Sequence, residues 1–124
     1  SMEQVLDAKA ILRCQQEVRD VGVPEAMHTW VAKLVLASHP GQQFAPPRVD
    51  RYVRLGASPR GAQALILGAK VHAWRAGRPE IVAEDVQRTA LPALRHRLVT
   101  NFEAQADGIT TDGLIQDILE TVPV

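Results

Sequence analysis

Residues 58–77 constrain the fold of this 124-residue chain more than any other stretch. Ser58 is a favourable helix N-cap, and Pro59 follows it at the first helical position, where a missing backbone N–H costs nothing. The apolar side chains that follow recur at helical spacing on more than one stripe: Ala62, Leu65, Ile66, Leu67, Ala69, Val71, Ala73 and Trp74. A helix that is apolar on several sides has to be covered by other elements. The sequence therefore predicts a central helix that ends near Gly77.

Four other segments have helical periodicity. They lie near residues 4–20, 25–38 and 84–96, and after Thr110, whose hydroxyl can cap a last helix that Pro123 stops. Residues 39–57 are rich in Pro and Gly and predict a long connection with one short extended piece. The predicted fold is a single all-α domain, a bundle of about five helices, with a very short strand pair from residues 42–55 and 98–102.

The apolar faces of these helices define the expected core. In the first helix they include Ile11 and Leu12. Trp30 and Trp74 both fall on apolar helical faces, so core packing is expected for them rather than the stacking of nucleic-acid bases.

Charge is balanced overall but unevenly distributed along the chain. There are 14 basic and 14 acidic residues, yet residues 48–97 carry ten basic and four acidic side chains and residues 98–124 carry five acidic ones and no basic one. The simplest interpretation is that these segments form ion pairs within one fold, with Arg95 and Arg97 contacting helix-end carbonyls or the acidic end. The alternative is a free-standing helical adaptor or nucleic-acid-binding module that uses the basic middle segment. Nucleic-acid binding is disfavoured because only five aromatic residues are present.

The sequence lacks the residue patterns that most catalytic mechanisms need. The four histidines share no metal-ligand spacing, so no metal site is expected, and the single cysteine, Cys14, allows no disulfide framework. Glu84 and Asp85 are explained as acids in the first turn of a helix, where the dipole favours them. No apolar run reaches the roughly 20 residues that span a bilayer, and the first residues lack signal-peptide features, so a cytoplasmic location is expected.

Gly56 and Gly61 stand at the Gly-x-x-x-x-Gly spacing of a phosphate-binding loop, but the Lys and Ser or Thr that must follow are replaced by Ala62 and Gln63. Arg60 is the more informative residue, because it falls at the second helical position, where the dipole disfavours a cation. A guanidinium beside helix N–H groups could hold a phosphate. From spacing alone, a solvated arginine remains the alternative.

The segment "GASPR" at residues 56–60, "EDV" at 84–86, "LRHRL" at 94–98 and the Gly-x-Thr of 108–110 occur in a familiar order and spacing. With them, residues 52–124 resemble the C-terminal lid of MoxR-family AAA+ ATPases. Residues 11–40 are similar to the two helices that open the same lid, so the resemblance covers nearly the whole of residues 1–124.

The resemblance implies that Arg60 is the sensor 2 residue, which reaches the γ-phosphate of ATP held by a core domain. The sensor 2 segment 56–61 then supplies the expected cofactor contacts: Ser58, Pro59, Arg60 and Gly61. The core domain with its Walker motifs would precede residue 1 and is absent from this chain. Residues 1–124 are therefore expected neither to hydrolyse ATP nor to bind it tightly, whereas the full-length protein would use ATP and Mg.

The resemblance also implies partners. These are the protein's own AAA+ core domain, neighbouring subunits of a ring, and proteins with a von Willebrand factor A domain, in chaperone-like assembly or activation of complexes. The sequence departs from the family at Val82 and Ala83, where Thr-Pro is usual, so the following helix is expected to start at a displaced position or to be less stable. Gly61 also replaces the usual alanine.

Overall fold

Helices make up most of residues 2–124, which the computed structural model describes, with side chains from residue 7 onward. The elements are α1 (Met2–Arg19), α2 (Glu25–Ala37), α3 (Pro47–Tyr52), β1 (Val53–Leu55), α4 (Pro59–Arg75), α5 (Ala83–Leu94), β2 (Val99–Thr100), α6 (Phe102–Ala106) and α7 (Thr111–Thr121). The five predicted helices are all present, and β1 pairs antiparallel with β2, so the predicted all-α fold with a small strand pair is confirmed.

Two short helices were not predicted. The connection at residues 39–57 contains α3, which begins at Pro47 after Pro46, and α6 follows Asn101, whose side-chain oxygen accepts a hydrogen bond from the Ala104 N–H at 3.0 Å. Each helix has six residues or fewer, which is too short for an apolar period to be seen in the sequence.

The ends of α4 follow the sequence closely. The Ser58 hydroxyl accepts a hydrogen bond from the Arg60 N–H at 3.3 Å, as an N-cap does. At the other end Gly77 has a φ of 74°, a left-handed conformation that glycine adopts without strain. The Arg78 N–H then bonds to the Ala73 carbonyl at 2.9 Å, which closes the helix.

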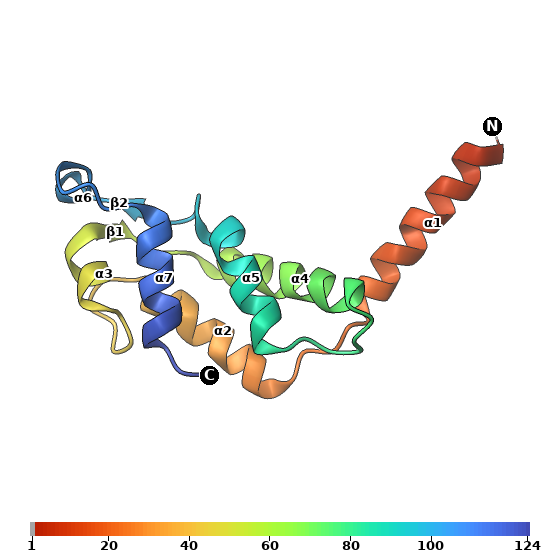
Figure 1. Ribbon diagram of the computed structural model, residues 1–124, viewed down its shortest axis with the longest axis horizontal. Coiled ribbons are helices and arrows are strands. Elements are labelled where there is room, and N and C mark those ends of the chain that lie inside the picture. The colour runs from red at the N-terminus through yellow and green to blue at the C-terminus, as the bar shows by residue number, and fades with distance from the viewer. Residues whose placement is uncertain (1) are drawn as a thin grey trace.

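One face of α4 forms the centre of the core. Leu65, Ala69 and Ala73 are fully buried, and the most extensive contact of this helix is with α5. The helices α2 and α7 complete the bundle around it, as Figure 1 shows. In α2, Trp30 is buried as predicted, and its indole N–H donates to the Val122 carbonyl at 3.2 Å.

The second apolar stripe of α4 is not covered, which contradicts the expectation of a helix surrounded on several sides. Leu67 is 56% exposed and Val71 is 37% exposed. Trp74 is only half-buried, with its indole N–H bonded to Glu17 at 2.9 Å. The helix that crosses this side is α1, and most of its length projects away from the bundle (Figure 1). Two apolar residues of α1 that were expected in the core are exposed as well, Ile11 at 58% and Leu12 at 64%.

The start of α5 shows how the missing Thr-Pro is compensated. Val82 occupies the N-cap position without a side-chain acceptor, but the buried carboxylate of Asp85 accepts a hydrogen bond from the Val82 N–H at 2.9 Å. Arg78 donates to both oxygens of the same carboxylate. The helix consequently begins at Ala83, one residue before the predicted start.

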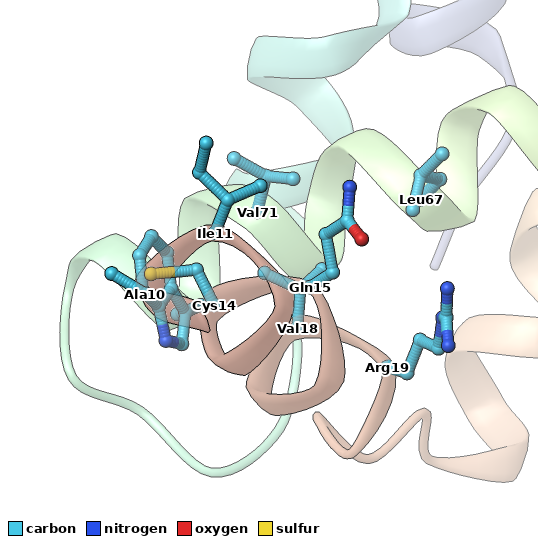
Figure 2. Close-up of a pocket in the computed structure, with 9 residues that line it drawn as sticks. Ala10, Ile11, Cys14, Gln15, Val18, Arg19, Leu67 and Val71 are labelled. Atoms are coloured by element: carbon cyan, nitrogen blue, oxygen red, sulfur yellow. The ribbon is translucent and has the colours of Figure 1, made fainter. Parts of the chain in front are cut away.

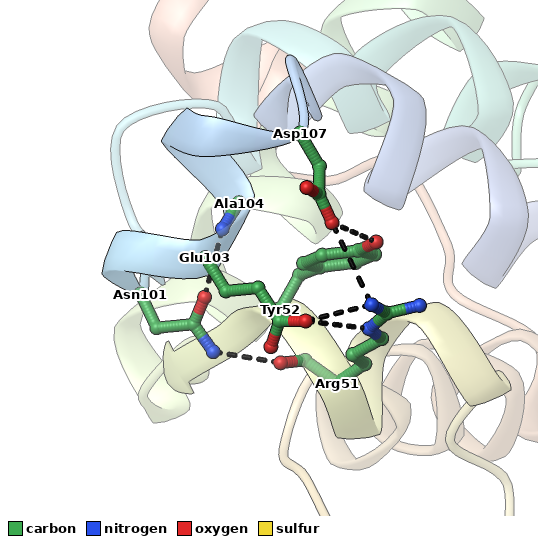
Figure 3. Close-up of polar contacts among 6 residues, drawn as sticks. All are labelled: Arg51, Tyr52, Asn101, Glu103, Ala104 and Asp107. Carbon is green, nitrogen blue, oxygen red and sulfur yellow. Dashed lines mark hydrogen bonds and ion pairs between the residues drawn. The ribbon is translucent and has the colours of Figure 1, made fainter.

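Ion pairs join the basic middle segment to the acidic end, as the sequence predicts. Arg48 pairs with Asp117 at 3.3 Å, and Arg95 pairs with Asp112 at 2.8 Å. At the far end of the molecule from α1, a third connection ties α3 to α6, which Figure 3 shows in detail. There the pairs are between Arg51 and Glu103 and between Arg51 and Asp107, the Tyr52 hydroxyl donates to Asp107, and the Asn101 amide donates to the Arg51 carbonyl.

Candidate functional site

The candidate site is the start of α4, where the sequence places Ser58, Pro59, Arg60 and Gly61. The backbone N–H groups that could have held an anion are already engaged there. Pro59 has none, the Arg60 N–H bonds to the Ser58 hydroxyl, and the Gly61 N–H bonds to the Ser58 carbonyl at 2.8 Å. Of the helical residues in this segment, Arg60 therefore offers an anion its guanidinium rather than its backbone N–H.

Arg60 is exposed. Among the described residues its guanidinium takes part in no hydrogen bond and no ion pair, while its backbone is fixed in the first turn of a long helix. A side chain placed in this way can contact a group outside the described chain without first breaking a contact inside it. A planar guanidinium can bind two oxygens of one phosphate.

A second set of residues, which sequence reasoning missed, fixes the turn that leads into α4. The buried Ser38 hydroxyl accepts a hydrogen bond from the Ala57 N–H at 2.9 Å and donates to the Val35 carbonyl at 2.6 Å. The ring N–H of His39 donates to the Ala57 carbonyl at 2.6 Å. Both backbone groups of Ala57, the residue before the N-cap, are thereby held by the end of α2.

Gly56 makes this arrangement possible. A Cβ on Gly56 would lie 2.6 Å from the Ser38 carbonyl oxygen and 2.7 Å from the His39 ring, which no side chain could tolerate. The glycine was the available sequence signal, but its partners are almost 20 residues away in the chain and could not be identified from spacing.

Gly61 allows a second close approach, between the start of α4 and the end of α5. A Cβ on Gly61 would lie 3.0 Å from the Ala57 Cβ and 3.3 Å from a methyl group of Leu94, with the Arg97 Cδ at 3.6 Å. The close approach seen in the structure is thus to α5. The predicted contact of Gly61 with a nucleotide stays a prediction.

The cations of the segment 94–98 differ in their surroundings. Arg95 is paired with Asp112, and this contact raises the pKa of Arg95 and lowers the pKa of Asp112. Arg97 donates from Nε to the Ala93 carbonyl at 2.9 Å, so both arginines take the helix-end and ion-pair roles that the sequence predicts.

Among residues 7–124, whose side chains the structure describes, there is no cluster of three or more His, Cys, Asp or Glu side chains that could hold a metal ion. None of the described helices is long and apolar enough to cross a membrane. The group that the segment 56–61 can supply is an exposed guanidinium on a fixed helix start, which fits the recognition of a phosphate held elsewhere.

Comparisons with known proteins extend this description. Residues 46–118 match the family model of the AAA lid domain. Chaperone MoxR1 of Mycobacterium tuberculosis is 32% identical over 120 residues, which cover 97% of this chain and 32% of MoxR1. Protein MoxR of Methylorubrum extorquens is 39% identical over 77 residues, covering 60% of this chain and 22% of that protein. A crystal structure of a Cytophaga hutchinsonii protein assigned as an ATPase matches with a TM-score of 0.83 and 31% identity, covering 87% of this chain and 33% of that one.

The chain spans about a third of the length of MoxR1 and of the matched crystal structure. The family model covers the segment 56–61 and the whole of α4, together with α5 and the strand pair. The chain therefore belongs to the AAA lid domain family, in the group of MoxR-type AAA+ ATPases.

Proposed function

We propose that this chain is the nucleotide-sensing lid of a cytoplasmic MoxR-type ATPase, in which Arg60 contacts the γ-phosphate of ATP. The proposal rests on the position and surroundings of Arg60. It lies at a rigidly held helix start, it is exposed, and its guanidinium has no partner among the described residues. Ser58 and Pro59 shape that start, and Gly61 lets it pack against α5.

The segment 56–61 would form only part of the ATP site, and the core domain would form the rest. ATP with Mg, held by the core domain of the full-length protein, would supply the reacting phosphoryl group. This chain would supply one cation to that group. Because negative charge shifts onto oxygen atoms during phosphoryl transfer, a positioned guanidinium binds the transition state more strongly than the ground state. A flexible arginine would lose this advantage, so Ser38 and His39 act as positioning residues for Arg60 through their bonds to Ala57.

The same contact would link nucleotide state to the position of the lid. The helices α2, α4, α5 and α7 share one core, so a force on Arg60 is transmitted to the bundle as a whole. In the full-length protein we expect this motion to act on neighbouring subunits of a ring. Chaperone-like activation of protein complexes, with partners that contain a von Willebrand factor A domain, would follow from that motion.

Arg60→Ala in the full-length protein tests the proposal. Turnover of ATP should fall about 10- to 1,000-fold, as when one charge-stabilising donor is removed from an active site. Arg60→Lys should also be impaired, because an ammonium group lacks the planar fork. The melting temperature should stay unchanged, since no contact within the lid is lost.

Arg75→Ala is the matched control, because Arg75 is an exposed arginine in the last turn of the same helix. It should retain normal turnover. Normal steady-state hydrolysis in both Arg60 variants would refute the sensing role, and a collapsed thermal melt would show instead that Arg60 is structural.

A further inference from the structure

We propose that Arg97 is a second residue of the lid that binds the phosphate chain of ATP, beside Arg60. It lies where the end of α5 meets the start of α4. The Arg97 Cδ is 3.6 Å from the position that a Cβ on Gly61 would occupy, so the stem of this side chain lies against the residue that follows Arg60. The inference rests on the proposed function in one respect, namely that the full-length protein binds ATP at this side of the lid.

The guanidinium of Arg97 is held on one side and open on the other. Its Nε donates to the Ala93 carbonyl at 2.9 Å, which fixes the direction of the group. Within the part of the chain whose side chains are described, its two terminal nitrogens take part in no hydrogen bond and no ion pair, and the residue is exposed. These nitrogens are donors only. They can therefore bind phosphate oxygens without breaking a contact of the fold.

The charges around this corner of α4 and α5 favour a polyanion. The first turn of α4 contains no acidic residue, although the helix dipole favours one there. Among residues 7–124 neither Arg60 nor Arg97 has a carboxylate partner, whereas the nearby Arg95 is paired with Asp112. Uncompensated cations at the positive end of a helix are unfavourable. A phosphate chain carries several negative charges along its length, so it offsets both cations at once.

Two cavities elsewhere in the structure do not suit such a ligand. The groove between α1 and α4 has a volume of about 620 Å³, and Figure 2 shows that mostly apolar side chains face it, with Arg19 at one end. A smaller cavity of about 450 Å³ is lined in part by the carboxylates of Glu17 and Asp20. Apolar surface and negative charge both disfavour phosphate. The corner formed by α4 and α5 suits a phosphate chain better than either cavity.

Arg97 is expected to act differently from Arg60. Its guanidinium is held by the Ala93 carbonyl before any ligand arrives, so it should contact the phosphates in bound ATP as well as in the transition state. A contact that is equally strong in both states raises affinity more than it raises turnover. Loss of Arg97 should therefore raise the Kd and the KM for ATP more than it lowers kcat, whereas loss of Arg60 should act mainly on kcat.

Arg97→Gln in the full-length protein tests the inference. The amide nitrogen of Gln is as many bonds from the backbone as the Nε of Arg, so it can still donate to the Ala93 carbonyl, while the charge and the terminal nitrogens are lost. The Kd for a non-hydrolysable ATP analogue with Mg should rise about tenfold, as expected when a charge-assisted contact is removed. The melting temperature without nucleotide should stay unchanged, which separates this role from a structural one.

Arg88→Gln is the matched control, because it removes the same charge from an exposed arginine of α5. Its Kd for the analogue should equal that of wild type. Inorganic triphosphate, which is the phosphate chain without base or ribose, serves as a second probe. Its inhibition constant as a competitor of the analogue should also rise about tenfold in Arg97→Gln.

An unchanged Kd for the analogue in Arg97→Gln would overturn the inference. An unchanged inhibition constant for inorganic triphosphate would overturn it as well, because Arg97 would then lie away from the phosphates. A wild-type protein without affinity for the analogue would overturn the proposed function together with the inference. The turnover of the Arg60 variants is measured separately, so a failure of Arg60 sensing is distinct from a failure of phosphate binding by Arg97.

Discussion

Asp85 shows how much a single buried residue contributes to this fold. Its side chain is almost fully buried, binds Arg78 through both carboxylate oxygens and caps the backbone of α5. The hydrogen bonds from Arg78, reinforced by the one from the Val82 N–H, lower the pKa of this carboxyl although burial opposes them. The contact therefore stabilises the folded state in its ionised form.

Asp85→Asn should destabilise the chain by about 2 kcal/mol at pH 7, because hydrogen bonds to charged groups contribute roughly 1.5–3 kcal/mol. A lowered native pKa means that the stabilisation is complete above the unfolded carboxyl pKa of about 3.9 and is lost as the pH falls through the native value. The difference between wild type and variant should consequently shrink below about pH 4. Urea unfolding from pH 7 to pH 2 measures it.

Glu84→Gln is the control for that experiment. Glu84 is the neighbouring acid, but its side chain is 65% exposed and pairs with Arg88 one turn along the helix. Such pairs contribute only about 0.3–0.5 kcal/mol. A difference between wild type and Asp85→Asn that stays constant down to pH 2 would contradict the assigned role of the ionised carboxylate.

Residue-scale prediction from sequence succeeded where the partners are near one another in the chain. Ser58 and Thr110 cap α4 and α7 as expected, because each bonds to a backbone N–H two or three residues ahead. Ser38 and His39 were missed because their partner, Ala57, lies 19 and 18 residues away, and no local pattern encodes that contact.

At the scale of elements, the contact between α4 and α5 depends on a glycine. A Cβ on Gly68 would lie 2.2 Å from the Thr89 methyl carbon. Thr89 cannot turn away freely, because it is buried and its hydroxyl donates to the Asp85 carbonyl at 2.9 Å. The two helices therefore pack closely at this crossing because Gly68 has no side chain.

Gly68→Ala should destabilise the chain, although alanine has a helix propensity about 1 kcal/mol better than glycine. Overpacking of this kind typically costs about 1–3 kcal/mol, so we expect a net loss of up to about 2 kcal/mol in urea unfolding. Adding Thr89→Ala removes the obstructing atoms, and the coupling between the two changes should be at least about 1 kcal/mol and favourable. An alanine variant as stable as wild type would show that the helices can separate there at no cost.

Element prediction was accurate for the long helices and failed for two features. The helices α3 and α6 are too short to show a period, and they depend on local capping and on the contacts of Arg51, Tyr52, Glu103 and Asp107 (Figure 3). The apolar faces of α1 and α4 were predicted to be buried, but periodicity reports that a face is apolar and does not say which chain segment covers it. For this reason the sequence did not predict that apolar side chains of α1 and of the second stripe of α4 lie exposed.

At the scale of the whole molecule, the basic middle segment and the acidic end of the sequence form ion pairs with each other. Arg48, Arg51 and Arg95 all pair with acids from the last quarter of the chain. These contacts use part of the basic segment that a nucleic-acid-binding module would need. Such a module would also show DNA binding with a steep dependence on salt concentration, which this arrangement does not predict.

Joint replacement of Asp107, Asp112 and Asp117 by Asn tests the pairing directly. The three carboxylates lie opposite Arg51, Arg95 and Arg48 on partly exposed surfaces, so their attraction is screened by salt. The melting temperature of the triple variant should fall by a few degrees in 10 mM salt and by less in 500 mM salt.

A second triple variant, Asp7→Asn with Glu80→Gln and Glu120→Gln, makes the same change in net charge at acids for which the described residues show no ion pair. It should melt close to wild type at both salt concentrations. Equal melting of the two triple variants in 10 mM salt would mean that net charge alone, rather than pairing between the segments, governs this part of the stability.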